Sequence, residues 1–400
     1  MTDLLPPTTL HLQEHWRSPS LSPNTIVRAF KRMWTEIAAE RREGNRLSKQ
    51  LADGAMVRTQ TINLIALADS ETDLGRVDAL VHDLSEFVPS RIILLLDSHG
   101  WDDDLDITAE IEEHPRPLPL SPTRLEMVTV RARQEQLASV ALPLLVPELP
   151  DYVWCASGAF VDNELVTDLA HFSDRIIVDS SRAAEPGAAL RYLTRLCDDP
   201  RIDIRLGDFA WTRLTLWRQM IAQFFDTDDA LRCLANVDEV VVEYGEHQRS
   251  GRSATTSALL VTGWLATRLG WRTPGEELVR SRDGWKLTLR AGERGRSREV
   301  VLVLRPVSTD DPNPSLVSIQ LNAGGDSPGT FTVRRTAPEM IVTTSELPDQ
   351  APVERTTYAV NSEDQQLLTT ELRMSGQNEV SVQALAFASR LLSDEETSRR

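Results

Sequence analysis

The chain has 400 residues and a formal net charge of −17, from 43 Lys and Arg against 60 Asp and Glu. This length predicts two domains, each large enough to bury its own core. The acidic balance, with no basic cluster longer than a few residues, argues against a protein that binds a nucleic acid backbone.

No segment approaches eighteen uncharged apolar residues, and MTDLLPPTTLHL at the start lacks a basic region followed by an apolar run. We therefore expect a cytoplasmic protein with no membrane partner. The three cysteines are not in CxxC spacing, which predicts reduced packing residues: Cys155, Cys197 and Cys233. None of the three lysines follows a glycine, which excludes a P-loop nucleotidase: Lys31, Lys49 and Lys286.

The first half of the chain alternates between strand and helix patterns. After a Pro-rich leader, Ser22 to Asn24 can cap a helix that runs through Ile37. Nearly continuous Ile, Leu and Val segments then predict buried strands at 61–69, 91–98, 125–132, 151–157 and 175–180, with helices near 72–87, 134–145 and 163–172 and an acidic loop after 98. This order indicates an α/β domain with a doubly wound, mostly parallel sheet.

The segment GDFAWTRLTLWRQMIAQFFD, Gly207 to Asp226, predicts one amphipathic helix with Asp208 as its cap. Its apolar residues recur every three or four positions: Ala210, Leu214, Trp217, Ile221 and Phe224. Trp211, Arg213 and Arg218 fall outside this stripe, so they must pack elsewhere or face solvent. Two interpretations stay open, a core helix with well-packed tryptophans and an interface helix.

The pattern changes near Val237. A strand at 237–245 and a helix at 253–269 are followed by alternating segments at 286–292, 299–307, 316–324, 329–336 and 340–347. Period-two alternation between Gly, Pro and Asp turns predicts an antiparallel sheet, and thus an α+β domain. A last helix near 380–392 precedes a charged tail at 393–400.

Several short motifs could hold a metal or an anion. HLQEH at 11–15 matches an inverted zinc-protease pattern, but Pro7 and Pro19 leave little room for its helix. WDDDLD at 101–106 lacks the glycine of a calcium loop, since Ile107 stands there. The turns around Gly251 and Gly295 place arginines beside serines and could bind an anion or simply face solvent. We predict no metal site.

Catalytic signatures are missing: no GxGxxG follows the first strand, no GxSxG is present, and no histidine lies in a recognisable nucleophile motif. We therefore expect no cofactor and no enzymatic activity. His99 and His171 lie near strand ends, where doubly wound folds bind ligands, while His82, His114 and His247 are expected to be structural. The alternative is therefore a sugar-phosphate sensor or small-molecule enzyme that uses the strand ends around Asp97, Ser157 and Asp179.

Four segments resemble, in order, the glucose-6-phosphate dehydrogenase assembly protein family, OpcA: VPSRIILLL at 88–96, LPLLVPELPDYVWC at 142–155, the 207–226 segment and LLVTGWLATRLGW at 259–271. The resemblance covers about Arg58 to Trp271, and the DxAWTRxTxWR core at 208–218 is its most specific part. It is weaker in the C-terminal half.

This resemblance implies a non-catalytic assembly factor or allosteric activator that binds glucose-6-phosphate dehydrogenase and supports the oxidative pentose phosphate pathway. From the change of pattern near Val237 together with this resemblance, we expect a leader and helix at 1–56, an OpcA-like α/β domain at 57–232 and an α+β domain at 233–400. Because aromatic and arginine side chains dominate interface energies, we expect the partner interface at Trp211, Arg213, Trp217 and Arg218. Photosynthetic members use cysteines for thioredoxin-dependent control, but no paired motif here supports that role.

Overall fold

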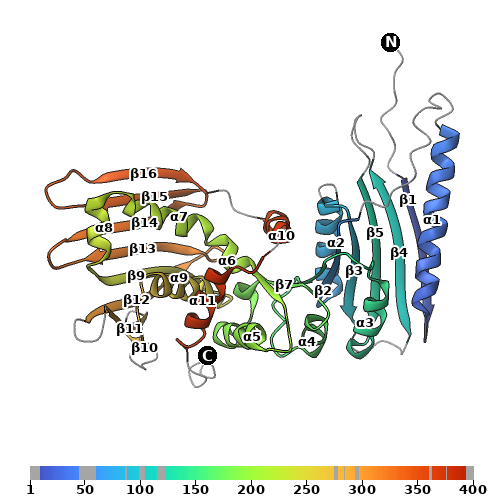
Figure 1. The fold of residues 1–400 in the computed structure, drawn as a ribbon, viewed down its shortest axis with the longest axis horizontal. Coiled ribbons are helices and arrows are strands. Elements are labelled where there is room, and N and C mark those ends of the chain that lie inside the picture. Colours follow the sequence, from blue (N-terminus) through green and yellow to red (C-terminus); the bar gives the residue numbers. More distant parts are fainter. Residues whose placement is uncertain are drawn as a thin grey trace, which may run out of the picture. The chain divides into compact units, whose positions relative to one another are not determined.

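A computed structural model of the chain describes residues 10–44, 60–85, 88–98, 104–114, 123–273, 278–282, 284–292, 297–359, 363–374 and 376–392. The chain forms two compact units, each built from several segments. Unit 1 comprises residues 1–178, 200–207 and 364–375, and unit 2 comprises 179–199, 208–363 and 376–400. Each unit contains one large sheet and its own helices (Figure 1).

The first sheet has eight strands in the order β1-β4-β5-β3-β2-β6-β7-β8. Pairing is parallel from β5 through β3, β2 and β6 to β7, and antiparallel between β1, β4 and β5. The parallel strands β2 and β3 consist almost entirely of buried residues, as expected for strands covered on both faces. The strands are β1 (Leu10–Ser18), β2 (Ile62–Ala68), β3 (Ser90–Asp97), β4 (Leu105–His114), β5 (Thr123–Ala132), β6 (Asp151–Cys155), β7 (Arg175–Val178) and β8 (Arg205–Asp208).

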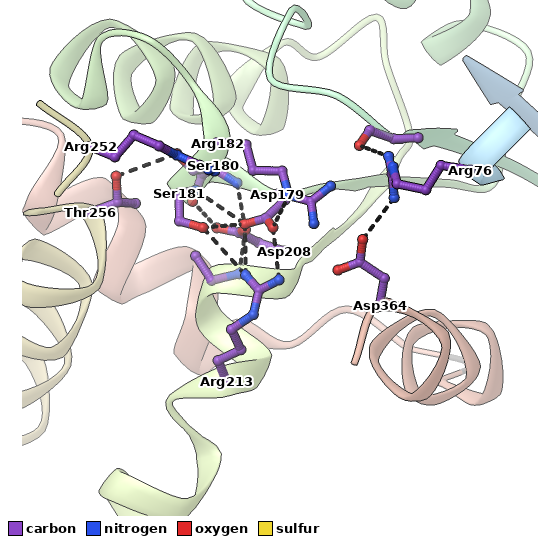
Figure 2. Close-up of polar contacts among 12 residues, drawn as sticks. Arg76, Asp179, Ser180, Ser181, Arg182, Asp208, Arg213, Arg252, Thr256 and Asp364 are labelled. Carbon is purple, nitrogen blue, oxygen red and sulfur yellow. Dashed lines mark hydrogen bonds and ion pairs between the residues drawn. The ribbon is translucent and has the colours of Figure 1, made fainter. Parts of the chain in front are cut away.

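Helices pack against this sheet through their apolar faces. Helix α1 contacts β1 and β4, and α2 contacts β2, β3 and β5. Arg76 of α2 donates to Asp364 at 2.9 Å and to the carbonyl oxygen of Ala156 at 3.0 Å, which ties α10 to α2 (Figure 2). The helices of unit 1 are α1 (Pro23–Gly44), α2 (Glu71–Ser85), α3 (Gln134–Ala141), the 3₁₀ turn η1 (Leu142–Leu144), α4 (Glu164–Ala170) and α10 (Asp364–Arg373).

A buried polar contact fixes α1 on the sheet. Glu126 of β5 is fully buried and accepts hydrogen bonds from Arg91 Nε at 2.8 Å and from the indole nitrogen of Trp34 in α1. Arg91 also donates to the carbonyl oxygen of Leu144 at 2.9 Å. A buried carboxylate is tolerated only when it is paired in this way.

The second sheet has eight strands in the order β10-β11-β12-β9-β13-β14-β15-β16, and all its pairs are antiparallel except β9 with β12. Buried and more exposed residues alternate along β11 and β13, so one face of the sheet is covered. The strands are β9 (Val237–His247), β10 (Val279–Ser281), β11 (Gly284–Ala291), β12 (Arg298–Thr309), β13 (Leu316–Ala323), β14 (Gly329–Ala337), β15 (Met340–Glu346) and β16 (Val353–Tyr358).

The helices of unit 2 centre on α9, in which ten of the fourteen residues are buried. α9 packs against β9, α5, α6 and α11. The helices of the unit are η2 (Ser180–Arg182), α5 (Pro186–Asp198), α6 (Phe209–Arg213), α7 (Thr215–Gln223), η3 (Phe224–Asp226), α8 (Asp228–Leu234), α9 (Thr255–Arg268) and α11 (Glu379–Ala388).

The predicted fold class is confirmed: a mostly parallel sheet comes first and a mostly antiparallel sheet follows. Two expectations about single elements were wrong. Part of the expected acidic loop is the strand β4, and part of the expected leader is β1. Other strands and helices that the sequence analysis did not assign are α5, α8, α10, β8, β10 and β16.

The two units do not follow the predicted ranges 57–232 and 233–400. Segment 208–232 belongs to unit 2, where the rings of Phe224 and Phe225 lie 5.4 and 4.8 Å from that of Phe331 in β14. Whether 1–56, 57–232 and 233–400 behave as separate folding domains stays a prediction. Among the described residues, no helix combines the length and the apolarity needed to cross a membrane.

Candidate functional site at the α6–α7 segment

The segment expected to be one helix is broken into three. Asp208 accepts a hydrogen bond from the backbone N–H of Ala210 at 3.0 Å, as a cap should, and α6 then runs for only five residues. At Leu214 the backbone leaves ideal helical geometry, with φ −78° and ψ −4°, and α7 starts at the next residue. The prediction of a single helix over 207–226 was therefore wrong, although the cap and most of the buried stripe are present.

This break determines where the tryptophans lie. Trp211 is only 4% exposed and Trp217 only 3%, so both indoles are buried within the chain. The guanidinium of Arg218 lies 3.6 Å from the centre of the Trp211 ring, and burial lowers the pKa of Arg218 to about 10. In this conformation neither tryptophan offers its ring to a partner, whereas Arg213 and Arg218 are partly exposed. The partner interface at these four residues stays a prediction.

Arg213 belongs to a network that we name the Asp179 cluster: Asp179, Ser180, Ser181, Arg182, Asp208 and Arg213 (Figure 2). Its guanidinium holds the buried carboxylate of Asp179 with two hydrogen bonds of 2.9 Å. Ser181 Oγ donates to the same carboxylate at 2.6 Å, and Arg182 Nε lies 3.1 Å away. Burial alone would raise the pKa of Asp179, but these partners, chiefly Arg213, hold it below its ordinary value.

Asp208 is the second buried carboxyl group of the cluster. It accepts hydrogen bonds from the backbone N–H of Ser180 at 3.0 Å and from Ser180 Oγ at 2.5 Å. Burial raises the pKa of Asp208 to about 7, although the bonds from Ser180 and Ala210 oppose the rise. Asp208 therefore joins the turn η2 to the start of α6, and it can exchange a proton near neutral pH.

The strand ends named in the alternative hypothesis do line a cavity in unit 1. This cavity has a volume of about 240 Å³, and Asp69, Asp97, Cys155 and Ser157 contribute to its wall. Burial raises the pKa of Asp69, and a hydrogen bond with Ser157 opposes the rise. Asp179 does not line it, and its volume is below the range of about 300–1,000 Å³ that is usual for organic ligands.

The histidine motifs do not form the sites that their spacing resembles. HLQEH lies in β1 rather than in a helix, and four residues of strand separate His11 from His15 by roughly 13 Å, too far to share a metal. Each instead contacts a carboxylate of β4, at 3.0 Å for Glu110 and 3.2 Å for Asp106. His171 Nδ1 lies 2.8 Å from the carbonyl oxygen of Thr167.

Ligand atoms of three residues lie within 4.8 Å of one another and could share a cation: Asp78, His82 and Glu110. Expected features that fall partly or wholly outside the described residues include His99, positions 101–103 of the acidic motif, positions 294–296 around Gly295 and the charged tail at 393–400. The three cysteines are free, and burial raises the pKa of Cys155 and Cys197 to about 12. Such thiols are poor nucleophiles at neutral pH.

Comparison with known proteins identifies both halves of the chain. The family model for the glucose-6-phosphate dehydrogenase subunit N-terminal domain matches residues 81–195, and the model for the C-terminal domain of that subunit matches residues 204–385. A likeness to the solved structure of the transcriptional regulator Gal80p from Kluyveromyces lactis has a TM-score of 0.44 at 10% identity, over 82% of this chain and 87% of that one.

Curated relatives bear the name OxPP cycle protein OpcA. Those of Synechocystis and Synechococcus elongatus are 29% and 30% identical over 46% of this chain, and the matches cover 38% and 40% of those proteins. That of Nostoc punctiforme is 30% identical over 46% of this chain and 38% of its own length. The chain thus spans about two fifths of the length of these relatives. Together with the two domain matches, these similarities show that the chain belongs to the OpcA family of glucose-6-phosphate dehydrogenase assembly proteins.

Proposed function

We propose that the chain is a non-catalytic cytoplasmic partner of glucose-6-phosphate dehydrogenase that promotes its assembly or activity and so supports the oxidative pentose phosphate pathway. The observation that carries this proposal is the match of two consecutive domains described as parts of a glucose-6-phosphate dehydrogenase subunit. The curated relatives, named for the OxPP cycle, support the same pathway.

The proposed mechanism is selective binding to the active form or oligomer of the dehydrogenase. A ligand shifts a two-state equilibrium only through its differential affinity for the two states. A shift from 1:99 to 99:1 requires about 5.5 kcal/mol, and an interface hot spot contributes about 2 kcal/mol or more, so a few anchors suffice.

We place those anchors at the partly exposed guanidinium groups of Arg213 and Arg218. Buried rings would support both groups, because Arg218 stacks on Trp211 and the guanidinium of Arg213 lies 5.9 Å from the centre of the Phe209 ring. Arginines held in one geometry lose less side-chain entropy on binding than free ones, which favours their use at an interface.

The test is co-purification of the tagged chain with the dehydrogenase of the same cell, followed by assays of dehydrogenase activity and oligomeric state. We expect a complex and a change in activity, and Arg218→Ala should weaken the complex at least about tenfold, or about 1.4 kcal/mol. Arg232→Ala in α8 is the matched control, because Arg232 is 64% exposed and pairs with Asp229 of its own helix. The proposal fails if the dehydrogenase neither binds nor responds.

The alternative, a sugar-phosphate sensor or small-molecule enzyme in unit 1, would place its ligand in the strand-end cavity, where Asp97 and Ser157 line the wall. It predicts saturable binding or turnover of a small molecule by the isolated protein, weakened by Ser157→Ala or Asp97→Asn. Calorimetric titration of the natural chain and of Ser157→Ala with sugar phosphates, with no dehydrogenase present, separates this alternative from partner binding, because only a ligand in the strand-end cavity should be weakened by Ser157→Ala.

A further inference from the structure

Unit 2 contains a second cavity, apart from the Asp179 carboxylate and from the strand ends of unit 1. It has a volume of about 350 Å³ and lies between the starts of α5 and α9 and the strands β11 and β12. Its wall combines an apolar part with a polar part. Leu259, Leu278 and Trp285 belong to the apolar part, and Arg182, Arg252 and Ser253 to the polar part. This volume and this mixed lining are typical of a small-molecule site.

Two arginines lie at the wall of this cavity although the chain has a net charge of −17. The described residues of the wall include Arg182, Arg252 and the acid Glu185, and because Arg182 already pairs with Asp179, Arg252 is the arginine that we assign to an anion. An adjoining cavity of about 530 Å³ shares Trp285 and is lined by three further arginines, Arg280, Arg282 and Arg305, and by Glu246. Arginines gathered around a recess in an acidic protein attract and select anions.

The starts of both helices at this cavity lack a side-chain cap. Glu185 and Ala254 occupy the two cap positions, and neither makes a side-chain cap hydrogen bond. The first N–H groups of a helix have no partner within the helix, and they favour an anion where no side chain caps them. Helix α9, of fourteen residues, thus adds backbone donors to the arginines, whereas α5, of thirteen residues, adds fewer because its first residue, Pro186, has no N–H.

The turn that carries Arg252 is held in place by its own hydrogen bonds. His247 N–H donates to the carbonyl oxygen of Arg252 at 2.8 Å, and Ser250 Oγ lies 2.7 Å from His247 Nδ1. Gly251 has φ +67°, a conformation that glycine adopts without strain. The guanidinium of Arg252 makes a long 3.5 Å contact with the carbonyl oxygen of Pro312, so binding an anion breaks no strong bond.

We propose that this cavity binds a small organic phosphate. The phosphoryl group lies against Arg252, Ser253 and the starts of α5 and α9, and the attached ring lies against Trp285 and the apolar wall. Both a phosphorylated sugar and a nucleoside monophosphate have this chemistry, because each joins a phosphoryl group to a ring. This site goes beyond the proposed function and does not depend on whether the dehydrogenase is bound.

The test is isothermal titration of the full-length chain with inorganic phosphate, glucose 6-phosphate, AMP and unphosphorylated glucose. We expect saturable binding of at least one phosphate ester, weaker binding of inorganic phosphate and none of glucose. Preference for glucose 6-phosphate over AMP, or the reverse, shows whether the site selects a phosphorylated sugar or a nucleoside monophosphate. Absence of saturable binding by both esters overturns the proposal.

Variants locate the site. Arg252→Ala should weaken ester binding at least about tenfold, whereas Arg249→Ala, an exposed arginine of the same turn that does not line the cavity, should leave it unchanged. Trp285→Ala should weaken binding of the ester more than binding of inorganic phosphate. Should Arg252→Ala fail to fold, Ser250→Asp places a negative charge at the exposed rim and should abolish binding. Equal affinity in folded Arg252→Ala or Ser250→Asp overturns the assignment.

Discussion

Asp179 and Asp208 show how neighbouring carboxyl groups in one cluster acquire opposite properties. Both are buried, but only Asp179 has guanidinium partners. Asp208 receives neutral donors alone, from Ser180 and from the N–H of Ala210, and these do not offset the cost of burying its charge. The charge of Asp179 thus contributes to stability near neutral pH, whereas that of Asp208 opposes it.

The raised pKa of Asp208 gives a signed pH dependence. With a pKa of about 7 when folded and its ordinary value of 3.8 when unfolded, the folded state holds one more proton between these values. The contribution of protonated Asp208 to the free energy of unfolding is therefore fully present below pH 3.8. It falls as the pH rises and is lost above pH 7, a total change of about 4 kcal/mol. Urea unfolding at pH 5 and 8 should show Asp208→Asn to be more stable than the natural chain by about 4 kcal/mol at pH 8 and by only about 2 kcal/mol at pH 5.

The asparagine retains the hydrogen bonds of this position, since its oxygen can accept from the two N–H groups and its amide can donate to Ser180 Oγ. Asp203→Asn, at an exposed position before β8, is the control and should leave the profile unchanged. Identical pH profiles for Asp208→Asn and the natural chain would contradict the assignment.

Arg213 and Arg218 should differ in what they contribute to stability. Arg213→Ala removes two charge-assisted hydrogen bonds from the buried Asp179 carboxylate, and we expect a loss of about 2 kcal/mol, moderated by the partial exposure of Arg213. Arg218→Ala removes a cation–π contact with Trp211, worth about 1 kcal/mol. Unfolding by guanidinium chloride at pH 7 measures the free energy of unfolding of both variants.

A double variant separates the ion pair from packing. If the loss in Arg213→Ala comes from an unpaired charge at position 179, adding Asp179→Asn should recover part of it. Additive losses would show instead that Arg213 acts through its aliphatic stem.

At the scale of elements, two helical glycines form a matched pair. In α9, a Cβ at Gly263 would overlap the carbonyl oxygen of Ala384 in α11, so glycine is required where these helices pack. In α2, nothing lies within 4 Å of a Cβ at Gly75. We expect Gly75→Ala to stabilise the chain by about 0.4–1 kcal/mol and Gly263→Ala to destabilise it by more than about 2 kcal/mol.

Differential scanning calorimetry measures the change in melting temperature of Gly75→Ala and of Gly263→Ala. Because alanine favours helix at both positions, helix propensity alone predicts the same sign for both variants. A stabilising Gly263→Ala would mean that α9 and α11 pack less closely than described here.

Helices and strands with a clear pattern of apolar residues could be predicted from the sequence, and those with a weak pattern could not. Buried strands such as β2 and β3 are predictable because their residues are almost all apolar. In β4, the buried residues Ile107, Ala109 and Ile111 alternate with polar or acidic residues, and this acidic content concealed a strand that faces the core on one side only. The break at Leu214 left no local signal, because neither glycine nor proline marks it and tertiary packing decides it.

The candidate site was predictable only in part. The cap role of Asp208 and an aromatic–arginine segment follow from local sequence, and both are present. Asp179 and Arg213 are 34 positions apart in the sequence. Their ion pair is a tertiary contact, so the local sequence could not predict it. The same holds for Arg252 and Trp285, which only the fold brings to one cavity.

At the scale of the whole molecule, the chain crosses between the two units several times, and segment 208–232 packs in unit 2. Phe224 and Phe225 contact Phe331, so a cut between 232 and 233 separates residues that pack together. Aromatic contacts of this kind contribute about 0.5–1.5 kcal/mol each beyond the apolar area they bury.

Coexpressed pieces 1–232 and 233–400 should therefore co-purify as a complex. Phe225→Ser in the first piece should weaken that complex, because its ring lies 4.8 Å from that of Phe331. Phe172→Ser, at a ring that is 62% exposed, is the matched control and should leave the complex intact. Size-exclusion chromatography distinguishes the outcomes: two separate, individually folded peaks would support independent domains at the predicted boundary, whereas one joint peak would show that residues 208–232 belong with the second sheet.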